Sequence, residues 1–323
     1  MSDINRLILI GDVRRRLCEI PDNSVQCVVT SPPYWGLRDY GHDGQIGLEQ
    51  TPEEYVAEMV AVFREVRRVL KDDGTLWLNL GDSYFSTTKG TGGMNPETSP
   101  KNAIKGKNNF QAFEPIRVQS GDLPLKQKDL VGIPWRVAFA LQADGWWLRQ
   151  DIIWHKPNPM PESVTDRCTK AHEYLFLFTK SARYYFNHES IKERGVMVAG
   201  DSAGSRQRDT RETHGLGGGN DGLNAAKAKL AQELADKGYN TRNKRSVWTI
   251  PTRPFKGAHF AVMPEALVEP CILAGSKQGD LILDPFLGSG TVAVVAQRHA
   301  RRWVGCELNP EYVNIIEQRV GLL

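Results

Sequence analysis

The chain has 323 residues, with 41 Lys and Arg against 38 Asp and Glu and a formal net charge of +3. This length allows about two domains with a substantial core, and the mildly basic balance suits a nucleic-acid partner without requiring one. The chain has five scattered cysteines, no signal-peptide pattern and no apolar run of membrane length. These features predict a reduced, cytoplasmic protein without a metal site. They exclude a disulfide-rich secreted protein and a membrane protein.

The first thirty residues have the pattern of a β-α-β unit. An apolar strand over residues 7–10 precedes Asp12, a helix with apolar residues at helical spacing follows, and a second apolar run covers residues 25–29. Asp12 can cap the helix, or its carboxylate can accept a hydrogen bond from an adenine amino group. Its position alone favours the cap.

The second strand ends at Thr30-Ser31-Pro32-Pro33-Tyr34-Trp35, where two prolines forbid its continuation. Ligands bind at the carboxyl ends of strands in open α/β sheets. The Ser31 hydroxyl and the Pro32 carbonyl could accept both N–H bonds of an exocyclic amine, and the Tyr34 ring could stack on a base that has left its duplex. The alternative is a plain surface turn, in which Ser-Pro-Pro sequences are common.

Further strands and helices are predicted up to residue 186. Thr51-Pro52-Glu53-Glu54 is typical of a capping box with proline at the first helical position, and Asp72-Asp73-Gly74 should end that helix. Alternation of strands and helices indicates a parallel α/β sheet. The remaining elements are strands at 75–80 and 147–154, a helix at 133–141, and a hairpin formed by 173–178 and 184–186.

Two basic stretches interrupt this pattern. Residues 86–128 have no apolar period, and we interpret them either as a DNA-contacting arm or as a plain flexible insertion. Residues 187–246 are rich in arginine, which could track phosphates and read guanine edges or could merely solvate a small lobe. The side chains predicted to contact DNA, which include one in the loop after the Ser-Pro-Pro motif, are Arg38, Lys105, Arg206, Arg208, Arg211, Arg242 and Lys244.

The carboxyl-terminal segment carries a second motif. A strand over residues 280–283 leads into Asp284-Pro285-Phe286-Leu287-Gly288-Ser289-Gly290-Thr291, and a helix over 292–299 follows. A strand over 303–306 then ends in Glu307, at the spacing where a carboxylate binds ribose hydroxyls. No phosphate-binding lysine follows the glycines, so the pattern favours an adenosine-type ligand such as S-adenosylmethionine over a nucleotide. The alternative is a tight turn followed by a solvated acid.

Together the two motifs resemble those of the β group of amino-methylating DNA methyltransferases, in which an S/D-P-P-Y/W motif precedes the cofactor motif. Residues 30–35 match the catalytic motif and residues 283–291 match the cofactor motif. Residues 257–264, Gly-Ala-His-Phe-Ala-Val-Met-Pro, more weakly resemble the family segment that closes over the methionine of the cofactor. The resemblance covers most of the chain except the two basic stretches.

The resemblance implies a circularly permuted, Rossmann-like α/β sheet that binds S-adenosylmethionine and carries basic DNA-recognition insertions. It makes Asp12 an adenine contact, places Glu307 on the ribose and sets Phe286 against the cofactor. The implied catalytic residues are Ser31, Pro32, Pro33 and Tyr34. The implied cofactor-binding residues are Asp12, Phe260, Asp284, Phe286, Gly288, Ser289, Gly290, Thr291 and Glu307.

The implied reaction is transfer of a methyl group to the exocyclic amine of a flipped base in double-stranded DNA. Ser31, where many relatives have Asp, resembles the N4-cytosine subset more than the N6-adenine subset. The other interpretations are an RNA or protein methyltransferase and a non-catalytic DNA-binding regulator. The sequence leaves open the recognition sequence, a homodimer and a separate cognate restriction nuclease.

The expected organisation follows from these assignments. The catalytic half covers residues 1–85 and resumes over 129–186, with the basic insertion 86–128 between them. Residues 187–246 form the expected target-recognition region, and residues 247–323 form the cofactor-binding half.

Overall fold

The computed structural model describes residues 6–37, 41–85, 125–198, 229, 232, 236, 239–252 and 262–321. The chain divides into two compact units. The larger unit joins residues 1–186 to residues 246–323, and the smaller unit covers residues 187–245. Among the described residues, no helix combines the length and the apolar character needed to cross a membrane.

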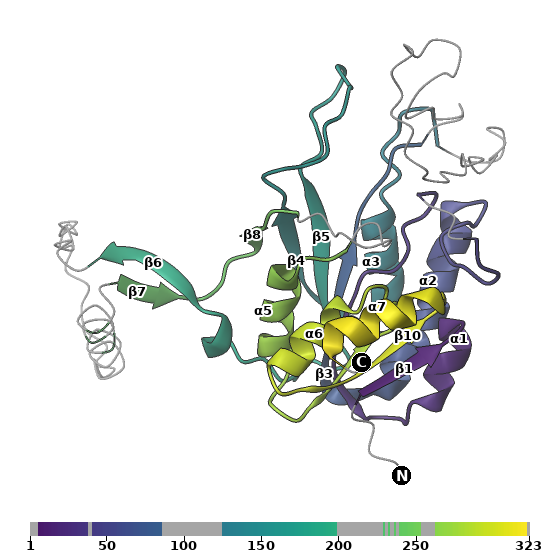
Figure 1. The fold of residues 1–323 in the computed structure, drawn as a ribbon. Coiled ribbons are helices and arrows are strands. Elements are labelled where there is room, and N and C mark those ends of the chain that lie inside the picture. Colours follow the sequence, from purple (N-terminus) through teal and green to yellow (C-terminus); the bar gives the residue numbers. More distant parts are fainter. Residues whose placement is uncertain are drawn as a thin grey trace, which may run out of the picture. The chain divides into compact units, whose positions relative to one another are not determined.

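The larger unit is built on one eight-stranded sheet (Figure 1). All neighbouring strands are parallel except at β5, which runs antiparallel to β3 and to β4. In spatial order the strands are β1 (Arg6–Ile10), β10 (Arg302–Glu307), β9 (Leu281–Asp284), β2 (Val25–Thr30), β3 (Leu70–Leu80), β5 (His172–Thr179), β4 (Trp147–His155) and β8 (Val247–Thr249).

This strand order confirms the permuted topology. The late strands β9 and β10 lie between the early strands β1 and β2, and β1 pairs in parallel with β10. The cofactor motif after β9 and the Ser-Pro-Pro motif after β2 therefore leave adjacent strands at the same edge of the sheet, because carboxyl ends of parallel neighbours coincide.

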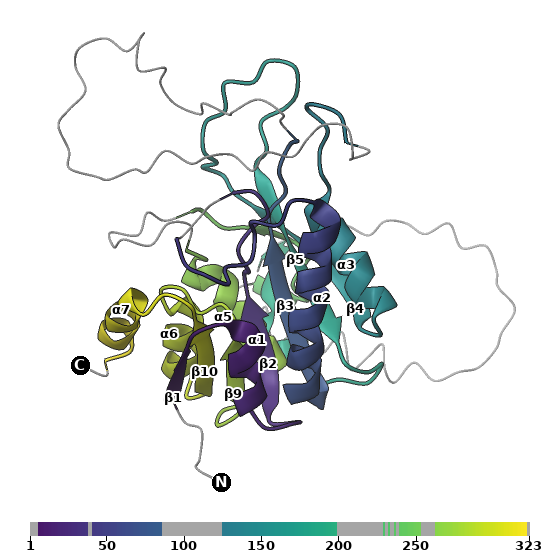
Figure 2. The ribbon, with the colours of Figure 1, turned by 90° about the vertical axis from the view of Figure 1, so that its right-hand side faces the viewer.

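Helices cover both faces of the sheet (Figure 2). One face carries α1 (Val13–Arg16), α2 (Pro52–Val69) and α3 (Ile133–Ala143), and the other carries α5 (Glu265–Gly275), α6 (Thr291–Arg298) and α7 (Glu311–Val320). All six residues of β2 are buried, as its apolar sequence predicts for a strand covered on both faces. The largest fully buried side chains include Trp77, Trp303, Tyr55 and Phe63.

Helix α2 confirms its predicted start but not its predicted end. The Thr51 hydroxyl accepts from the Glu54 N–H at 3.1 Å, and the Glu54 carboxylate accepts from the Thr51 N–H at 3.1 Å, which completes the capping box. The helix stops at Val69 and strand β3 begins at Leu70, so the predicted turn at 72–74 lies inside the strand. The register with β2 shifts there, since Val25 lies opposite Leu70 and Cys27 lies opposite Thr75.

The predicted hairpin of 173–178 with 184–186 is wrong. Strand β5 pairs with β3 on one side and with β4 on the other, so neither edge is left for a third strand. Residues 184–186 have no strand structure, and the Tyr185 N–H donates instead to the Asp73 carbonyl at 2.8 Å. Their aromatic sequence favours a strand locally, and tertiary pairing overrides that preference.

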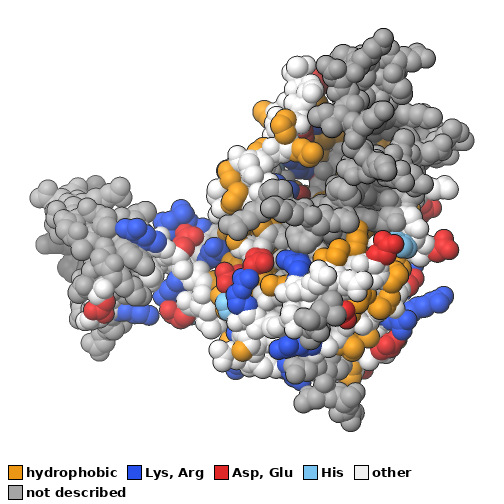
Figure 3. Space-filling view, in the orientation of Figure 1, with side chains coloured by type: hydrophobic (Ala, Val, Ile, Leu, Met, Phe, Trp, Pro, Cys, Tyr) orange, Lys and Arg blue, Asp and Glu red, His pale blue; other side chains and the backbone are white. Residues whose placement is uncertain are grey.

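In the smaller unit, β6 (Glu193–Val198) pairs antiparallel with β7 (Tyr239–Arg242). Figure 3 shows Lys and Arg side chains around its described residues. The Glu193 carboxylate, at the start of β6, accepts from Arg242 at 2.9 Å and from Arg245 at 2.6 Å. These ion pairs connect the start of β6 to the end of β7. Burial favours a raised pKa at Glu193, but the two arginines outweigh it and lower that pKa.

A buried hydrogen bond joins the two motifs across β2 and β9. The Thr30 hydroxyl donates to Asp284 Oδ1 at 2.7 Å, and both side chains are almost inaccessible, at 0% and 2% exposure. The bond therefore connects two residues that are 254 positions apart in the chain.

We expect Thr30→Val, which keeps the shape and loses the hydroxyl, to lower the free energy of unfolding by about 1–3 kcal/mol. The cost arises because the buried Asp284 carboxyl loses a donor. Thr30→Ser is the matched control, since it keeps the hydroxyl and removes one methyl group, worth about 1 kcal/mol. Urea denaturation measures both variants, and a Val variant more stable than the Ser variant would contradict the assigned role of the bond.

Candidate active site

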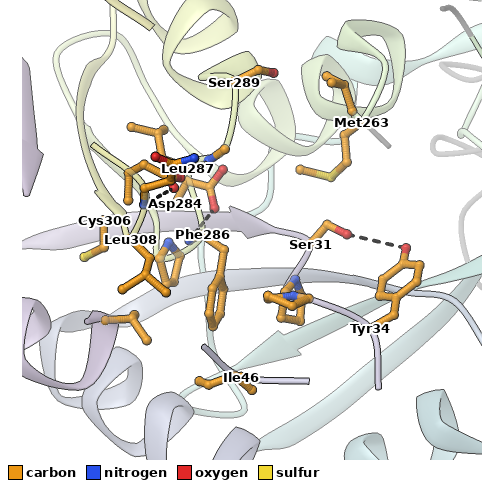
Figure 4. Close-up of a pocket in the computed structure, with 18 of the residues that line it drawn as sticks. Ser31, Tyr34, Ile46, Met263, Asp284, Phe286, Leu287, Ser289, Cys306 and Leu308 are labelled. Atoms are coloured by element: carbon orange, nitrogen blue, oxygen red, sulfur yellow. Dashed lines mark hydrogen bonds between the residues drawn. The ribbon is translucent and has the colours of Figure 1, made fainter. Parts of the chain in front are cut away.

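A cavity of about 470 Å³ opens at the carboxyl ends of β9, β10, β1 and β2. Figure 4 shows Asp284, Phe286, Ser31 and Tyr34 following one another along it, with Met263 and Ile46 on opposite sides. The two sequence motifs thus share one cavity. Its lining includes Asp12, Ser31, Pro32, Pro33, Tyr34, Asp284, Phe286, Gly288, Ser289, Thr291 and Glu307.

Glu307 connects the end of β10 to the glycine turn. Its Oε2 accepts from the Gly288 N–H at 2.7 Å, and its Oε1 accepts from the Asn309 N–H at 2.8 Å. The carboxylate therefore shapes the turn as well as facing the cavity. Each carboxylate oxygen has a further lone pair, so the side chain can still accept hydrogen bonds from a pair of ligand hydroxyls.

Burial dominates the electrostatics of this half of the cavity. Desolvation raises the pKa of Asp284 from 3.8 to about 7, although Thr30 and the Phe286 N–H stabilise its charged form. Desolvation likewise raises the pKa of Glu307 from 4.5 to about 7, against the hydrogen bonds from Asn309 and Gly288. Two carboxyl groups close to protonation favour a cationic or hydroxyl-rich ligand over an anionic one.

Asp12 has the capping geometry, and its carboxylate also lines the cavity. Its Oδ1 accepts from the Arg14 N–H at 2.9 Å, and the Arg14 guanidinium pairs with Oδ2 at 2.7 Å. Burial favours a raised pKa, but the hydrogen bonds from Arg14 prevail and lower the pKa of Asp12. The structure thus shows the cap, and the adenine contact stays a prediction.

Helix α7 binds the remainder of the glycine motif. Arg319 of α7 donates to the Ser289 hydroxyl at 2.8 Å and to the Thr291 hydroxyl at 3.2 Å. Gly290 is not among the residues that line the cavity, and its predicted cofactor contact stays a prediction. It begins α6 with a left-handed φ of 79°, and a Cβ there would lie 3.0 Å from Ile316, so glycine is needed for the turn.

The Ser-Pro-Pro-Tyr segment is fixed by contacts with helix α2 and with the residue that follows strand β3. Tyr55 of α2 donates its hydroxyl to the Pro33 carbonyl at 2.9 Å. The Tyr34 ring packs against Gly81, where a Cβ would come within 2.5 Å of the ring. Backbone and ring are therefore fixed by groups outside the motif, as a site with a rigid geometry requires.

A polar network surrounds the Tyr34 hydroxyl. Ser31 donates to the Tyr34 hydroxyl at 3.4 Å (Figure 4), and Tyr34 donates to Glu173 Oε2 at 2.7 Å. Lys156 forms an ion pair with Glu173 Oε1 and stacks its ammonium on the Trp154 ring at 4.3 Å. Asn79, Lys156, Glu173 and Trp154 all line the cavity.

Sequence reasoning missed these residues. Asn79 is the only strongly polar side chain in the apolar part of β3, which is a signal that could have been used. Glu173 lies at the beginning of β5, and an antiparallel strand begins at the edge where its parallel neighbours end. Its place at the cavity could follow only from knowing that β5 is antiparallel.

Several predicted residues cannot be placed at the cavity. Arg242 and Lys244 belong to the smaller unit. The predicted contacts that lie outside the described residues are Arg38, Lys105, Arg206, Arg208, Arg211 and Phe260. Their roles stay predictions.

Comparison with known proteins gives the family of this architecture. Residues 25–318 match the family of N6 and N4 methyltransferases described as DNA methylase. The chain is 46% identical over 310 residues to the type II methyltransferase M.Cfr9I of Citrobacter freundii, covering 96% of this chain and 86% of that protein. It is 44% identical over 313 residues to the type II methyltransferase M.SmaI of Serratia marcescens, covering 97% and 90%.

Solved structures share the fold. The PvuII DNA methyltransferase, named as cytosine-N4-specific, aligns with a TM-score of 0.61 at 19% identity, covering 98% of this chain and 86% of that one. A putative DNA modification methylase of Thermus thermophilus, complexed with S-adenosyl-L-methionine, aligns with a TM-score of 0.57 at 24% identity, covering 98% and 93%. These likenesses confirm a Rossmann-like sheet.

The raised pKa values of Asp284 and Glu307 make stability depend on pH. The unfolded chain releases these protons near 3.8 and 4.5, whereas the folded chain holds them until about pH 7. The free energy of unfolding is therefore highest below the unfolded pKa values and falls as the pH rises towards 7. We expect Asp284→Asn to make this fall shallower, and Asp284→Asn with Glu307→Gln to flatten it further. Urea denaturation of the ligand-free protein across this pH range measures the slope, and an unchanged slope would contradict the burial effect.

Proposed function

The chain belongs to the N4/N6 family of DNA methyltransferases, and we propose that it moves a methyl group from S-adenosylmethionine to the N4 amine of a cytosine flipped out of double-stranded DNA. One observation carries this proposal. The Ser31–Tyr34 motif and the Asp284–Thr291 motif line a single cavity, although they lie far apart in the sequence. A methyl donor and an acceptor base bound at the two motifs would be neighbours.

The cavity suits the cofactor chemically. Lys156 is the only Lys or Arg among its described lining residues, which disfavours a phosphate-bearing ligand. Asp12 and Glu307 supply carboxylates for an adenine amine and for ribose hydroxyls, and Phe286 supplies an apolar surface. When bound, S-adenosylmethionine supplies a methyl group already activated by its sulfonium charge.

Ser31 and Tyr34 would prepare the acceptor. An exocyclic amine is a poor nucleophile because its lone pair is delocalised into the ring. Hydrogen bonds from its N–H groups to the Ser31 hydroxyl and to the Pro32 carbonyl would shift it towards a tetrahedral shape with a directed lone pair. The Tyr34 ring would stack on the base and hold the amine in line with the methyl group.

Cytosine is preferred over adenine because of Ser31. The resemblance to the N4-cytosine subset depends on this serine in place of aspartate, and the N6-adenine reaction is the alternative. Both bases present an amine beside a ring-nitrogen acceptor, so the Ser31 hydroxyl and the Pro32 carbonyl could accept from the amine of either base.

The smaller unit is the proposed target-recognition part. Residues 187–245 carry 11 Lys and Arg against 8 Asp and Glu, which suits contact with DNA phosphates. We propose a role in a restriction-modification system, with a separate cognate nuclease. A homodimer is an open question that sedimentation would answer.

Labelled methyl transfer from S-adenosylmethionine to duplex DNA, followed by nucleoside mass analysis, tests the proposed reaction. We expect N4-methylcytosine. N6-methyladenine would correct the base and leave the mechanism in place, and the same labelled DNA would map the recognition sequence. Label that appears only in RNA or in protein would contradict the assignment of substrate.

We expect Tyr34→Ala to reduce turnover much more than affinity for S-adenosylmethionine. Stacking of a base on an aromatic ring contributes about 1–3 kcal/mol, which corresponds to a roughly 5- to 150-fold loss of turnover. Tyr34→Phe is the matched variant, because it keeps the ring and should retain more activity than the Ala variant. Initial rates and calorimetric cofactor binding measure the two quantities, and equal losses in both would refute the role of Tyr34 at the base.

A further inference from the structure

The hydroxyl of Tyr34 lies between one possible donor and two acceptors. Ser31 Oγ is 3.4 Å from it, and the two acceptors are Glu173 Oε2 at 2.7 Å and Asn79 Oδ1 at 3.3 Å. A carboxylate has no proton to donate, so the shortest of these bonds can form only with Tyr34 as the donor. The single Tyr34 proton is therefore directed to Glu173 and not to Ser31.

Asn79 is oriented to reinforce this direction. Its Nδ2 donates to the Tyr174 carbonyl at 3.0 Å and to Glu173 Oε2 at 3.2 Å. Both partners only accept, so the amide nitrogen must face them and the amide oxygen must face Tyr34. Neither Glu173 nor Asn79 can therefore donate to the Tyr34 hydroxyl.

Ser31 completes the chain. Because the Tyr34 proton points to Glu173, the Tyr34 oxygen offers a lone pair towards Ser31, and the Ser31 proton is donated to it. The Ser31 oxygen then presents lone pairs, and no proton, to the cavity. This is the polarity that an N–H donor of an amine requires, and it disfavours a carbonyl oxygen at the same place.

We propose that Glu173, assisted by Asn79, is a positioning residue that sets the direction of the Ser31–Tyr34 hydrogen-bond chain, so that the site selects an amine over a carbonyl. This inference rests on the proposed function, since it concerns the amine that would bind at Ser31. Glu173 acts through Tyr34. It is held in place by Lys156, which follows the adjacent strand β4, and by Asn79 of the adjacent strand β3.

Two further features keep the direction fixed. Lys156 pairs with the other carboxylate oxygen, Glu173 Oε1, so Glu173 cannot rotate away from Tyr34 without breaking an ion pair. Both side chains of that pair are largely shielded, with 18% and 16% exposure. Burial, together with the adjacent Glu173 charge, raises the pKa of Tyr34 well above its ordinary value, so its hydroxyl keeps its proton.

Glu173→Gln tests the proposal with almost no change in shape. The Lys156 ammonium is a donor, so the new amide oxygen should face it and the new amide nitrogen should face Tyr34. Tyr34 would then lose its nearest acceptor and keep only the longer bond to Asn79. We expect turnover to fall about 10-fold, with affinity for S-adenosylmethionine and the melting temperature nearly unchanged.

A double-mutant cycle with Tyr34→Phe separates this role from a structural one. Without the Tyr34 hydroxyl, Glu173 can no longer set the direction of the hydrogen bond to Ser31. Glu173→Gln should therefore change turnover by less than about 2-fold in the Tyr34→Phe background. Independent, multiplicative losses in the double variant would overturn the proposal. A fall in melting temperature large enough to explain the loss of turnover by unfolding of the variant would overturn the proposal as well.

A binding measurement gives a readout that structural damage cannot imitate. In DNA with uracil in place of the target cytosine, the flipped base presents a carbonyl oxygen where the amine was. Glu173→Gln should improve the affinity for the uracil duplex relative to the cytosine duplex, because Ser31 can then turn its proton towards the cavity. An unchanged ratio of the two affinities would contradict the proposal.

Failure of the proposed function would be visible separately. The wild-type product is identified first by nucleoside mass analysis, and the cycle is measured on whichever base carries the label. If that base is adenine, hypoxanthine replaces uracil in the binding measurement, because the same exchange of amine for carbonyl is tested.

Discussion

Parallel pairing of β2 with β9 is the constraint on which the site depends. Cys27 lies opposite Ile282 and Val28 opposite Leu283, so the two chain segments reach the sheet edge together. Each of the two strands ends in a buried polar residue, and the hydrogen bond from Thr30 to Asp284 joins these two side chains. The glycine turn and the Pro-Pro turn both begin directly after the two residues of that bond. The permuted order of the chain is therefore compatible with the family reaction because strand pairing, and not sequence order, determines which loops meet.

The two halves of the cavity differ in how they control charge. Around Asp284 and Glu307, burial acts against ionisation, and backbone N–H groups compensate for it only in part. Around Tyr34, an ion pair and an amide fix the direction of each hydrogen bond instead. The first arrangement suits a cationic, hydroxylated cofactor, and the second suits recognition of a neutral amine.

The sequence predicted the parts of the site that require special backbone. Two prolines must end β2, and a left-handed residue must begin α6 at Gly290, so both turns are recognisable without a structure. The capping box at Thr51 was predictable for the same reason, because its hydrogen bonds are local. Glu173 was not predictable, since its position depends on the antiparallel direction of β5, which is a property of the whole sheet. The predicted hairpin at 184–186 failed for a related reason, because local strand preference cannot show that both edges of β5 are occupied.

The pairing of β1 with β10 has a consequence for how the protein is made. Arg6 lies opposite Trp303, and β10 is the only neighbour of β1 in the sheet as described. A ribosome releases β1 long before β10, so β1 has no partner in the sheet until β10 has been made. Its side chains Leu7 and Ile10, 38% and 43% exposed even in the finished sheet, would stay open to chaperones throughout that interval. The same delay withholds the Glu307 carboxylate from the glycine turn, so the cavity can be completed only after β10 has emerged. A chain that has not yet added β10 to the sheet therefore has no finished cavity.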